Sequence, residues 1–192
     1  MPSLTLIRHG ETEWSRSGQH TSTTDLDLTP AGEEAARKLR TRFAPADFGL
    51  VLVSPRLRAR RTADLAGFTG YEIDDDLVEW NYGDYEGRTG ADIRQERPGW
   101  TIWTGDPPGG ETAVQVRERL TRFIDRTLQR AQDEAIERIA VFGHGHALRA
   151  LTLCWLGFDF SLGDHFPLDT AAVCELGFYK GGRALIGWNM AR

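Results

Sequence analysis

Short apolar runs alternate with amphipathic segments along this chain, and that alternation restricts its fold more than any other feature. Residues 3–8, 49–53 and 138–142 are rich in leucine, valine and isoleucine and predict buried strands, and residues 71–74 predict a further short one. Strands that alternate with helices are typical of a mainly parallel sheet covered on both faces. We therefore predict an α/β fold with three layers, α/β/α, around a mostly parallel central sheet.

Capping signals mark where the helices between these strands begin. The pairs Thr29-Pro30 and Ser54-Pro55 each combine a capping residue with a proline suited to the first helical turn, and the second pair predicts a helix from near Arg56. Residues 112–115 resemble a capping box and open a segment with one apolar face. Near the end of the chain, two strands around residues 181–182, both glycine, predict a hairpin.

The length of 192 residues suits one α/β domain, and we predict a single domain over residues 1–192. Residues 77–112 differ from the rest because they carry three of the six tryptophans, several glycines and two adjacent prolines. This segment is too irregular for the predicted core and too aromatic for a linker. It is therefore expected to form a lobe over a pocket.

Composition excludes some classes of partner. A net charge of −5 provides no basic field for nucleic acid or for an anionic membrane surface. No apolar run reaches the roughly eighteen residues of a membrane span, and the chain enters its first strand without a signal sequence, which predicts a cytoplasmic protein. Cys154 and Cys174 lack metal-like spacing and are expected to be reduced, although a single disulfide is also compatible with the sequence.

Polar residues directly follow two of the predicted strands. Arg8 and His9 come at the end of the first apolar run, and His144 follows the run at 138–142. In open parallel sheets ligands bind beyond the carboxyl ends of the strands, so these residues form a candidate site. Arg58 lies in the first turn of the helix after a third strand. Two guanidinium groups and two imidazole rings would form a cage for an anion, and tetrahedral phosphate fits such a cage best.

Transfer of a phosphoryl group from an ester also requires a proton donor beside the leaving oxygen. Glu79 lies between Val78 and Trp80 in the aromatic lobe, and such apolar neighbours are expected to keep its carboxyl group protonated. Glu79 is therefore the predicted general acid.

Five ordered motifs resemble one known family. They are LIRHGETEW, SPRLRARRTA, LVEWNYGDYEG, PPGGET and VFGHGHALRAL, and they span roughly residues 4–155. Together they resemble the histidine phosphatase superfamily, the phosphoglycerate mutase-like proteins. The stretch TEWSRSGQHT is most similar to a branch of small phosphatases that includes broad-specificity acid phosphatases and sugar-bisphosphatases.

The resemblance implies a role for each residue of the cage. His9 would be the nucleophile that forms a phosphohistidine, and Glu79 would act first as an acid and then as a base. Arg8, Arg58 and His144 would bind the phosphoryl oxygens. The family implies no metal and no cofactor, since arginines can supply the positive charge that magnesium provides in many phosphoryl-transfer enzymes.

Other positions that match the family's motifs are expected to contact substrate, namely Ser15, Thr21, Ser22, Tyr82 and Gly145. The family often has asparagine at position 15 and glycine at position 22, so Ser22 must tolerate whatever backbone conformation glycine allows. Most members have serine where this chain has Gly143, and one hydrogen bond to phosphate is therefore in doubt. Trp80, Tyr82 and Trp103 are the expected walls of the cavity.

We therefore predict a phosphomonoesterase that hydrolyses small phosphorylated metabolites, and a homodimer is compatible with the sequence. The alternatives are a phosphoglycerate mutase, a non-catalytic phosphate-binding regulatory module, and a metallohydrolase with His144 and His146 as ligands. A mutase must keep water away from its phosphohistidine. The short segments after Glu79 and Gly187 predict an open site instead, which favours hydrolysis.

Overall fold

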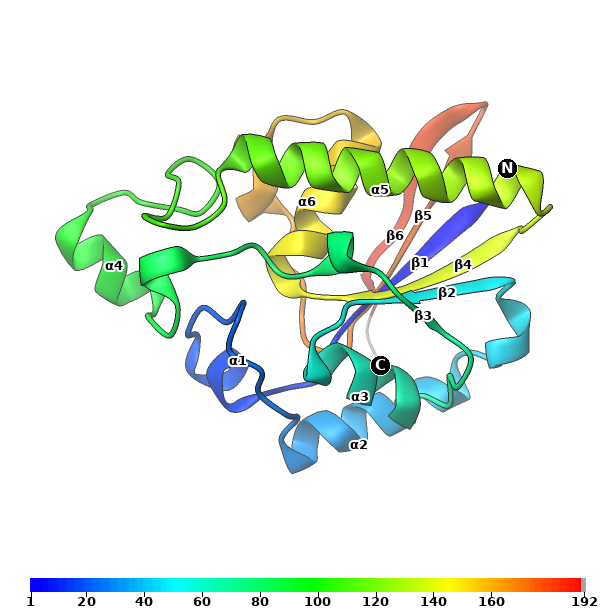
Figure 1. Cartoon of the computed structure of the whole chain (residues 1–192), viewed down its shortest axis with the longest axis horizontal. Coiled ribbons are helices and arrows are strands. Elements are labelled where there is room, and N and C mark those ends of the chain that lie inside the picture. Colours follow the sequence, from blue (N-terminus) through cyan, green and yellow to red (C-terminus); the bar gives the residue numbers. More distant parts are fainter. Residues whose placement is uncertain (191–192) are drawn as a thin grey trace.

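The computed structural model describes residues 1–190 and contains one six-stranded sheet between two layers of helices (Figure 1). The strands are β1 (Ser3–Arg8), β2 (Leu50–Val53), β3 (Glu72–Ile73), β4 (Arg138–Gly143), β5 (Val173–Tyr179) and β6 (Gly182–Met190). The helices are α1 (Glu13–Ser17), α2 (Pro30–Lys38), α3 (Leu57–Leu65), α4 (Gly90–Glu96), α5 (Ala113–Asp133) and α6 (Gly145–Leu156). Short 3-10 helices occupy residues 39–41, 45–47, 75–77, 83–85 and 160–165.

The strands of the sheet lie in the order β3-β2-β4-β1-β5-β6. The first four are parallel, β5 runs antiparallel to β1, and β5 and β6 form the predicted hairpin. The predicted α/β fold with a mostly parallel central sheet is thereby confirmed. Arg8 at the end of β1 lies opposite Gly143 at the end of β4. The two carboxyl ends are therefore level, and the residues that follow them, His9 and His144, emerge at the same edge of the sheet.

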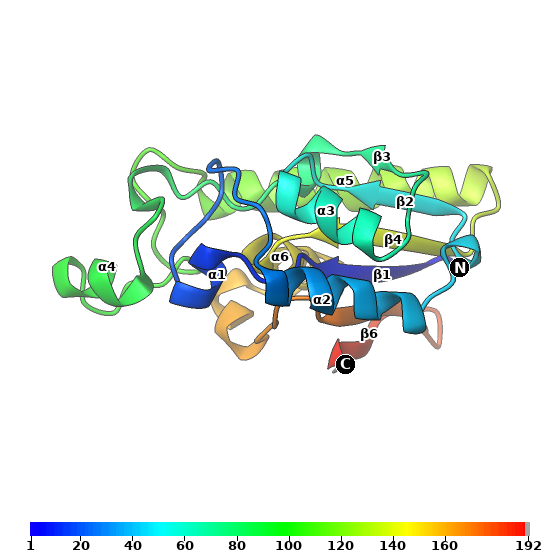
Figure 2. The ribbon, with the colours of Figure 1, turned by 90° about the horizontal axis from the view of Figure 1, so that it is seen from below.

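Helices cover both faces of the sheet. α5 and α6 lie on one face, and α2 and α3 lie on the other (Figures 1 and 2). Successive strand residues point to opposite faces, so Leu4 and Leu6 of β1 pack in the larger apolar cluster while Ile7 packs in the smaller one. β2 and β4 divide their side chains between the two clusters in the same way. This explains why the central strands are apolar along their whole length.

Two predicted helix starts are confirmed, and the details of a third are wrong. Thr29 caps α2, and Thr112 forms a capping box at the start of α5. Ser54 does not cap α3, which begins at Leu57. The hydroxyl of Ser54 lies instead 2.7 Å from Nε2 of His144. A serine before a proline can bond either to the next helix or to a neighbouring strand end, and only the tertiary fold decides between them.

The segment 77–112 contributes more side chains to the core than its irregular sequence predicted, although many of its residues are exposed. Its aromatic side chains are buried in the larger apolar cluster, and they are Trp80, Tyr82, Tyr85, Trp100 and Trp103. Trp80 lies edge-on to Trp103, with ring centroids 5.7 Å apart. The segment also contains α4, which the sequence reasoning did not anticipate. These rings meet through tertiary contacts without a repeating spacing, so no periodic pattern revealed them.

The predicted polar loop at 15–25 is also more ordered than expected. Its start belongs to α1, which Thr12 caps through a capping box with Ser15. The helix ends at Gly18, whose φ of 80° is a left-handed conformation that suits glycine. The remainder of the loop runs beside the segment 86–89, to which it is hydrogen-bonded.

None of the helices in residues 1–190 combines the length and the apolar character needed to cross a membrane. Both cysteines are free thiols, and Cys174 is buried while Cys154 is partly exposed. Burial raises the pKa of both thiols, so neither is activated as a thiolate.

Candidate active site

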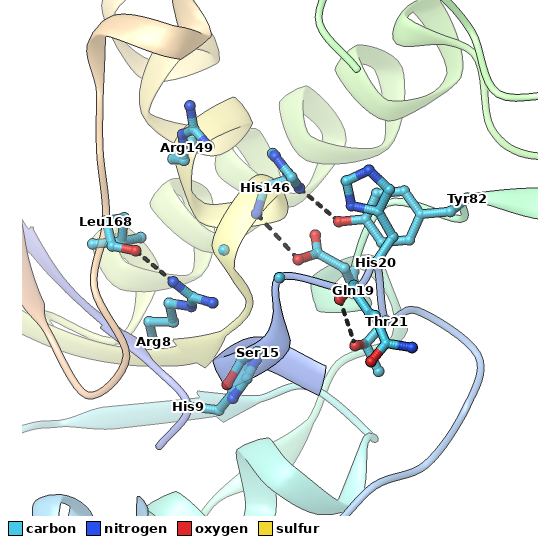
Figure 3. A pocket seen from close by; sticks show the side chains of 13 residues that line it. Arg8, His9, Ser15, Gln19, His20, Thr21, Tyr82, His146, Arg149 and Leu168 are labelled. Carbon is cyan, nitrogen blue, oxygen red and sulfur yellow. Dashed lines mark hydrogen bonds between the residues drawn. The ribbon is translucent and has the colours of Figure 1, made fainter. Parts of the chain in front are cut away.

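A cavity of about 200 Å³ opens at the carboxyl ends of β1 and β4 (Figure 3). Seven of the predicted site residues line it, namely Arg8, His9, Ser15, Thr21, Glu79, Tyr82 and Gly145. Three others do not line the cavity but lie against residues that do; these are Arg58, His144 and Ser22. The lining also includes residues that the sequence reasoning did not select, namely Gly18, Gln19, His20, His146, Arg149 and Leu168.

His9 is held rigidly at the end of β1. Its backbone N–H donates to the carbonyl of Gly143 at 3.0 Å, and its carbonyl accepts from Ala171 N at 3.0 Å. Its side chain lies with Nδ1 2.7 Å from the carbonyl oxygen of Gly10. A carbonyl only accepts, so Nδ1 carries the hydrogen and the lone pair of a neutral ring is on Nε2. Burial and the charges of Arg58 and Arg8 hold the pKa of His9 well below 6.5, so the ring is neutral.

Gly10 allows the turn after His9 to pack closely on α2. A Cβ atom at this position would lie 2.5 Å from the carbonyl oxygen of Gly32, which is too short for any real contact. The N–H of Gly10 donates to the hydroxyl of Thr62 on α3 at 2.9 Å. The peptide that receives the His9 Nδ1 hydrogen bond is therefore fixed by two helices from the same side of the sheet.

Arg8 places a guanidinium group beside His9. Its Nη1 donates to the carbonyl oxygen of Leu168, and within the described chain its buried Nε has no partner. Burial lowers the pKa of Arg8, while the nearby Glu79 opposes this shift. An arginine with an unused donor at a cavity is suited to bind an anionic oxygen.

Arg58 and His144 lie together next to His9. Arg58 is fully buried on α3, and its Nε donates to Nδ1 of His144 at 3.1 Å. His144 therefore carries its hydrogen on Nε2, which donates to the hydroxyl of Ser54. Burial and the charge of Arg58 hold the pKa of His144 well below 6.5. The His144 and His9 rings are 5.3 Å apart between centroids, so the predicted cluster forms, with Arg58 and His144 behind the cavity lining.

Glu79 binds the first turn of α6. One carboxylate oxygen accepts from the N–H groups of Trp80 and Ala147, both at 2.8 Å, and the other accepts from His146 N at 3.1 Å. A helix N-terminus favours a negatively charged partner. The prediction that apolar neighbours surround this carboxyl group is therefore wrong, because the side chain of Trp80 packs away from it into the core.

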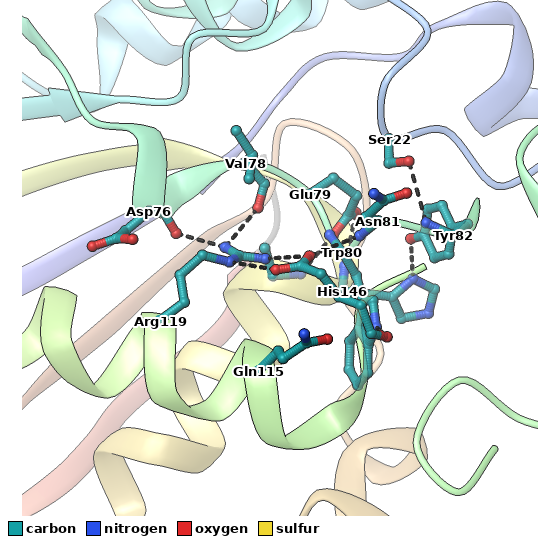
Figure 4. A network of polar contacts seen from close by, with 12 residues as sticks. Ser22, Asp76, Val78, Glu79, Trp80, Asn81, Tyr82, Gln115, Arg119 and His146 are labelled. Atoms are coloured by element: carbon teal, nitrogen blue, oxygen red, sulfur yellow. Dashed lines mark hydrogen bonds and ion pairs between the residues drawn. The ribbon is translucent and has the colours of Figure 1, made fainter. Parts of the chain in front are cut away.

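The backbone around Glu79 is fastened to α5 (Figure 4). Arg119 donates to the carbonyl of Val78 at 3.0 Å and also pairs with the carboxylate of Glu111. Glu111 in turn accepts from the N–H of Asn81 at 2.9 Å. This buried network holds the two residues on either side of the Glu79–Trp80 unit, so it fixes where the Glu79 carboxylate points.

Three residues that were not predicted line the cavity beside Tyr82. His20 stacks on the Tyr82 ring with centroids 4.5 Å apart, and the Tyr82 hydroxyl lies 2.6 Å from Nδ1 of His146. Burial lowers the pKa of His20 to about 4 and raises that of Tyr82, so both are neutral near pH 7. Arg149 follows Gly145 by four residues on α6. That spacing on one helix face was the signal that sequence reasoning missed.

Several predicted contacts take a different form in the structure. Trp80 and Trp103 are buried and do not line the cavity, which corrects the prediction of its walls, whereas Tyr82 does line it. The Ser15 hydroxyl faces its own helix cap, where it donates to Thr12 O at 3.0 Å. Ser22 is not among the residues with positive φ, so the expected glycine-like backbone is absent there.

The geometry gives no support to a metal centre at His144 and His146. Within residues 1–190 no group of three or more histidine, cysteine, aspartate or glutamate side chains is placed to hold a metal ion. Both ring nitrogens of His144 are used, one by Arg58 and the other by Ser54. Nδ1 of His146 is bonded to Tyr82.

Comparisons with known proteins agree with the motifs. A family model described as the histidine phosphatase superfamily (branch 1) matches residues 4–191. The acid phosphatase of Mycobacterium tuberculosis is 37% identical over 184 residues, which cover 95% of this chain and 89% of that protein. The sedoheptulose 1,7-bisphosphatase of Saccharomyces cerevisiae is 40% identical over 190 residues, with 82% of this chain and 70% of that protein covered.

The fold is also found in a solved structure. The solved structure of the protein encoded by an open reading frame of Mycobacterium tuberculosis superposes on this chain with a TM-score of 0.90 and 35% sequence identity, and the match covers 99% of this chain and 98% of that one. Family model, relatives and fold therefore lead to one conclusion. This chain belongs to the histidine phosphatase superfamily, branch 1.

Proposed function

We propose that this protein is a phosphomonoesterase that hydrolyses small phosphorylated metabolites through a phosphohistidine at His9. The observation that carries the proposal is the hydrogen bond from His9 Nδ1 to Gly10, because it leaves the nucleophilic lone pair on Nε2 of a neutral ring at the cavity. Two relatives named as an acid phosphatase and a sedoheptulose bisphosphatase support hydrolysis of phosphate esters.

In the first step, Nε2 of His9 attacks phosphorus, so a P–N bond forms while the P–O bond to the leaving alcohol breaks. The leaving oxygen takes a proton from Glu79, whose Oε2 has a single N–H partner in the structure and can hold a proton. A phosphate ester whose second ionisation lies at about pH 6 can bind as the monoanion and bring this proton to Glu79. The products are an alcohol, a phosphohistidine and the Glu79 carboxylate.

In the second step, a water molecule attacks the phosphohistidine. Its oxygen bonds to phosphorus, one of its protons passes to the Glu79 carboxylate, and the P–N electron pair returns to Nε2 of His9. Inorganic phosphate leaves and takes this proton from Glu79, so the enzyme returns to its starting state. Glu79 lines the same cavity as His9, as this exchange of protons requires.

Positive charge for the transferred phosphoryl group comes from arginine in this proposal, and we propose that no metal is required. Arg8 lines the cavity with an unused Nε donor. Arg58 and His144 lie behind His9, where the charge of Arg58 acts on the phosphoryl group. To bind phosphoryl oxygens directly, as we propose, His144 would give up its contact with Ser54, and Arg58 would give up one of its contacts with residues 21–24. Preorganised charges of this kind stabilise phosphoryl-transfer transition states.

Isolation of the intermediate tests this proposal. The enzyme is mixed with a ³²P-labelled phosphate ester, quenched in alkali during turnover, digested and mapped. We expect acid-labile label on the peptide that contains His9, and none in a His9→Ala variant. Label on another residue, or substantial turnover by His9→Ala, would contradict the proposal. A second assay follows 3-phosphoglycerate with bisphosphoglycerate, and efficient isomerisation with little phosphate release would assign the mutase reaction instead.

We further propose that the protein works in the cytoplasm. The two free thiols support this location, because cysteines in reducing compartments remain unpaired. Fractionation of cells with an antibody to the protein tests it.

A further inference from the structure

One wall of the cavity is a loop that has no regular structure of its own. Residues 19–25 follow α1 and contribute Gln19, His20 and Thr21 to the cavity lining. The first turn of α6 adjoins this loop in the lining, and the His146 and His20 rings are 5.9 Å apart between centroids. The position of the loop therefore decides how wide the space for a leaving group is.

A carboxylate binds the N–H groups of this loop. Glu86 accepts from Ser22 N at 2.9 Å and from Thr24 N at 2.9 Å, and it also accepts the Ser22 hydroxyl at 2.5 Å. Burial opposes the ionisation of Glu86, but these hydrogen bonds outweigh it and lower the pKa of the carboxyl group. Ser22 is thus tied to Glu86 by its backbone and by its side chain.

A guanidinium group binds the carbonyl groups of the same loop from the other side. Arg58 donates from Nη1 to Thr24 O at 3.1 Å, and from Nη2 to Thr21 O at 3.0 Å and Ser22 O at 3.3 Å. Two N–H groups of residues 21–24 therefore bind a negative side chain, and three of their carbonyl groups bind a positive one. Charge-assisted hydrogen bonds of this kind are stronger than neutral ones.

The loop is also attached to the backbone that follows Glu86. His20 donates to Arg88 O at 2.9 Å and accepts from Gly87 N at 2.8 Å. The Ser22 hydroxyl accepts from Tyr82 N at 3.3 Å (Figure 4). A displacement at Glu86 would thus be passed directly to His20 and Tyr82, which are stacked in the cavity.

We propose that Glu86 is a positioning residue. Together with Arg58, which binds the carbonyl groups of the same loop, it holds Ser22 in place and so sets the width of the cavity. The width of the cavity in turn decides which leaving groups fit. This inference rests on the proposed phosphatase function. Loss of the Glu86 charge would leave the Ser22 and Thr24 N–H groups poorly paired in a partly buried site, so the loop would relax. A wider cavity holds a compact ester less well while a bulky ester loses little. Misplacement of such a wall by an ångström can cost about 100-fold in rate.

The test compares Glu86→Gln and Ser22→Ala with Glu96→Gln. Glu96 is a matched control because it is an exposed glutamate of the same segment that pairs only with Arg88. The substrates are glycerol phosphate and 1-naphthyl phosphate. For Glu86→Gln we expect kcat/KM to fall at least about tenfold for glycerol phosphate, mostly through KM, and less than about threefold for naphthyl phosphate. Ser22→Ala should change the ratio of kcat/KM for glycerol phosphate to kcat/KM for naphthyl phosphate less, and Glu96→Gln should leave that ratio unchanged.

Two measurements make the test independent of the reaction assigned. In a double-mutant cycle on unfolding free energy, the effects of Ser22→Ala and Glu86→Gln should be less than additive, because both changes break the contact between the Ser22 hydroxyl and the Glu86 carboxylate. Hydrogen exchange of amides in residues 21–24 should accelerate at least tenfold in Glu86→Gln, with α6 unchanged. An unchanged substrate ratio or unchanged exchange would overturn the positioning role, whatever the wild-type activity. Absence of phosphate release by the wild type, with faster exchange in the variant, would overturn the proposed function alone.

Discussion

Nε of Arg58 lies 3.1 Å from Nδ1 of His144 and donates a hydrogen bond to it. This one contact sets the state of two rings. It forces the His144 hydrogen onto Nε2, toward Ser54, and it places a buried positive charge where it lowers the pKa of both His144 and His9. Burial and the charge of Arg58, which lies behind the cavity lining, thereby keep the His9 ring neutral.

Replacement of Arg58 by lysine should reduce activity sharply. Lysine keeps the charge but cannot reproduce the three directions in which the guanidinium donates. We expect Arg58→Lys to lower kcat/KM by about 100-fold or more, as loss of a member of a catalytic unit does. Steady-state kinetics with an aryl phosphate measure this. Arg61→Lys, on the same helix but paired with Glu33 outside the site, is the control and should retain near wild-type activity.

Replacement of Glu79 by glutamine should discriminate between leaving groups. The amide cannot supply a proton, so alkyl phosphates, whose alkoxide leaves poorly, should slow by about 100-fold or more, and p-nitrophenyl phosphate should slow much less. The measurement is the rate at which the variant hydrolyses an alkyl phosphate and p-nitrophenyl phosphate, each relative to the wild-type rate. Equal slowing of the two would move the acid role to another carboxyl group.

Stability should fall as the pH drops below about 6.5. Four histidines, His9, His20, His144 and His146, have lowered pKa values in the folded protein, while an unfolded histidine titrates near 6.5. Below that pH the unfolded chain binds more protons than the folded one, so protonation favours unfolding. Urea midpoints at pH 7.0, 6.0 and 5.0 should decrease in that order.

A single variant isolates one of these groups. His20 has a folded pKa of about 4, so His20→Gln should reduce the slope of unfolding free energy against pH by up to about 1.4 kcal/mol per pH unit between pH 6.5 and 4. His165, which is exposed, serves as a surface control when replaced by glutamine. A slope unchanged in His20→Gln would contradict the buried neutral state.

Alanine at Gly32 should destabilise the fold. A Cβ there would lie 2.2 Å from the carbonyl oxygen of Glu11, so α2 must move away from the turn that follows His9. We expect a loss of roughly 1–3 kcal/mol in unfolding free energy together with reduced kcat. Gly70→Ala is the control, because nothing lies within 4 Å of a Cβ at that position. Equal urea-unfolding midpoints for the two variants would show that the close approach of Gly32 to Glu11 does not contribute to stability.

Chelation should leave the activity unchanged. Both ring nitrogens of His144 are occupied by Arg58 and Ser54, and arginine supplies the positive charge in the proposed reaction. The rate after prolonged dialysis against EDTA measures this. A loss of activity that zinc or magnesium restores would favour the metallohydrolase alternative.

The strand ends explain what could be predicted from sequence. An apolar run that stops at Arg8 and another that stops before His144 place both residues at one edge of a parallel sheet, without knowledge of any contact. The surroundings of Glu79 could not be predicted in this way. Its oxygens accept from residues 146 and 147, and no local pattern shows that a helix end 67 or 68 residues away will meet it.

The same distinction applies to the aromatic segment. Burial of Trp80 and Trp103 depends on rings that pack at right angles across a fold, and their spacing in the chain has no period. Ser54 precedes a proline and therefore resembles a helix cap, but in the fold its hydroxyl contacts His144 instead of the helix. Local capping and strand signals were reliable where a single partner was available, as at Thr29.

Of the six strands, β1 is synthesised first, and it lies between β4 and β5, which are the fourth and fifth to be made. The backbone of Arg8 and His9 is held by Ala172 O and Ala171 N, and the Arg8 side chain by Leu168 O. On the ribosome, the proposed nucleophile His9 therefore emerges long before the segment that binds it. A nascent chain has to carry an unpaired apolar strand through most of its own translation, which makes β1 a natural client for chaperones. The same order means that the contacts of Arg8 and His9 with residues 168–172 form only after that segment has been made.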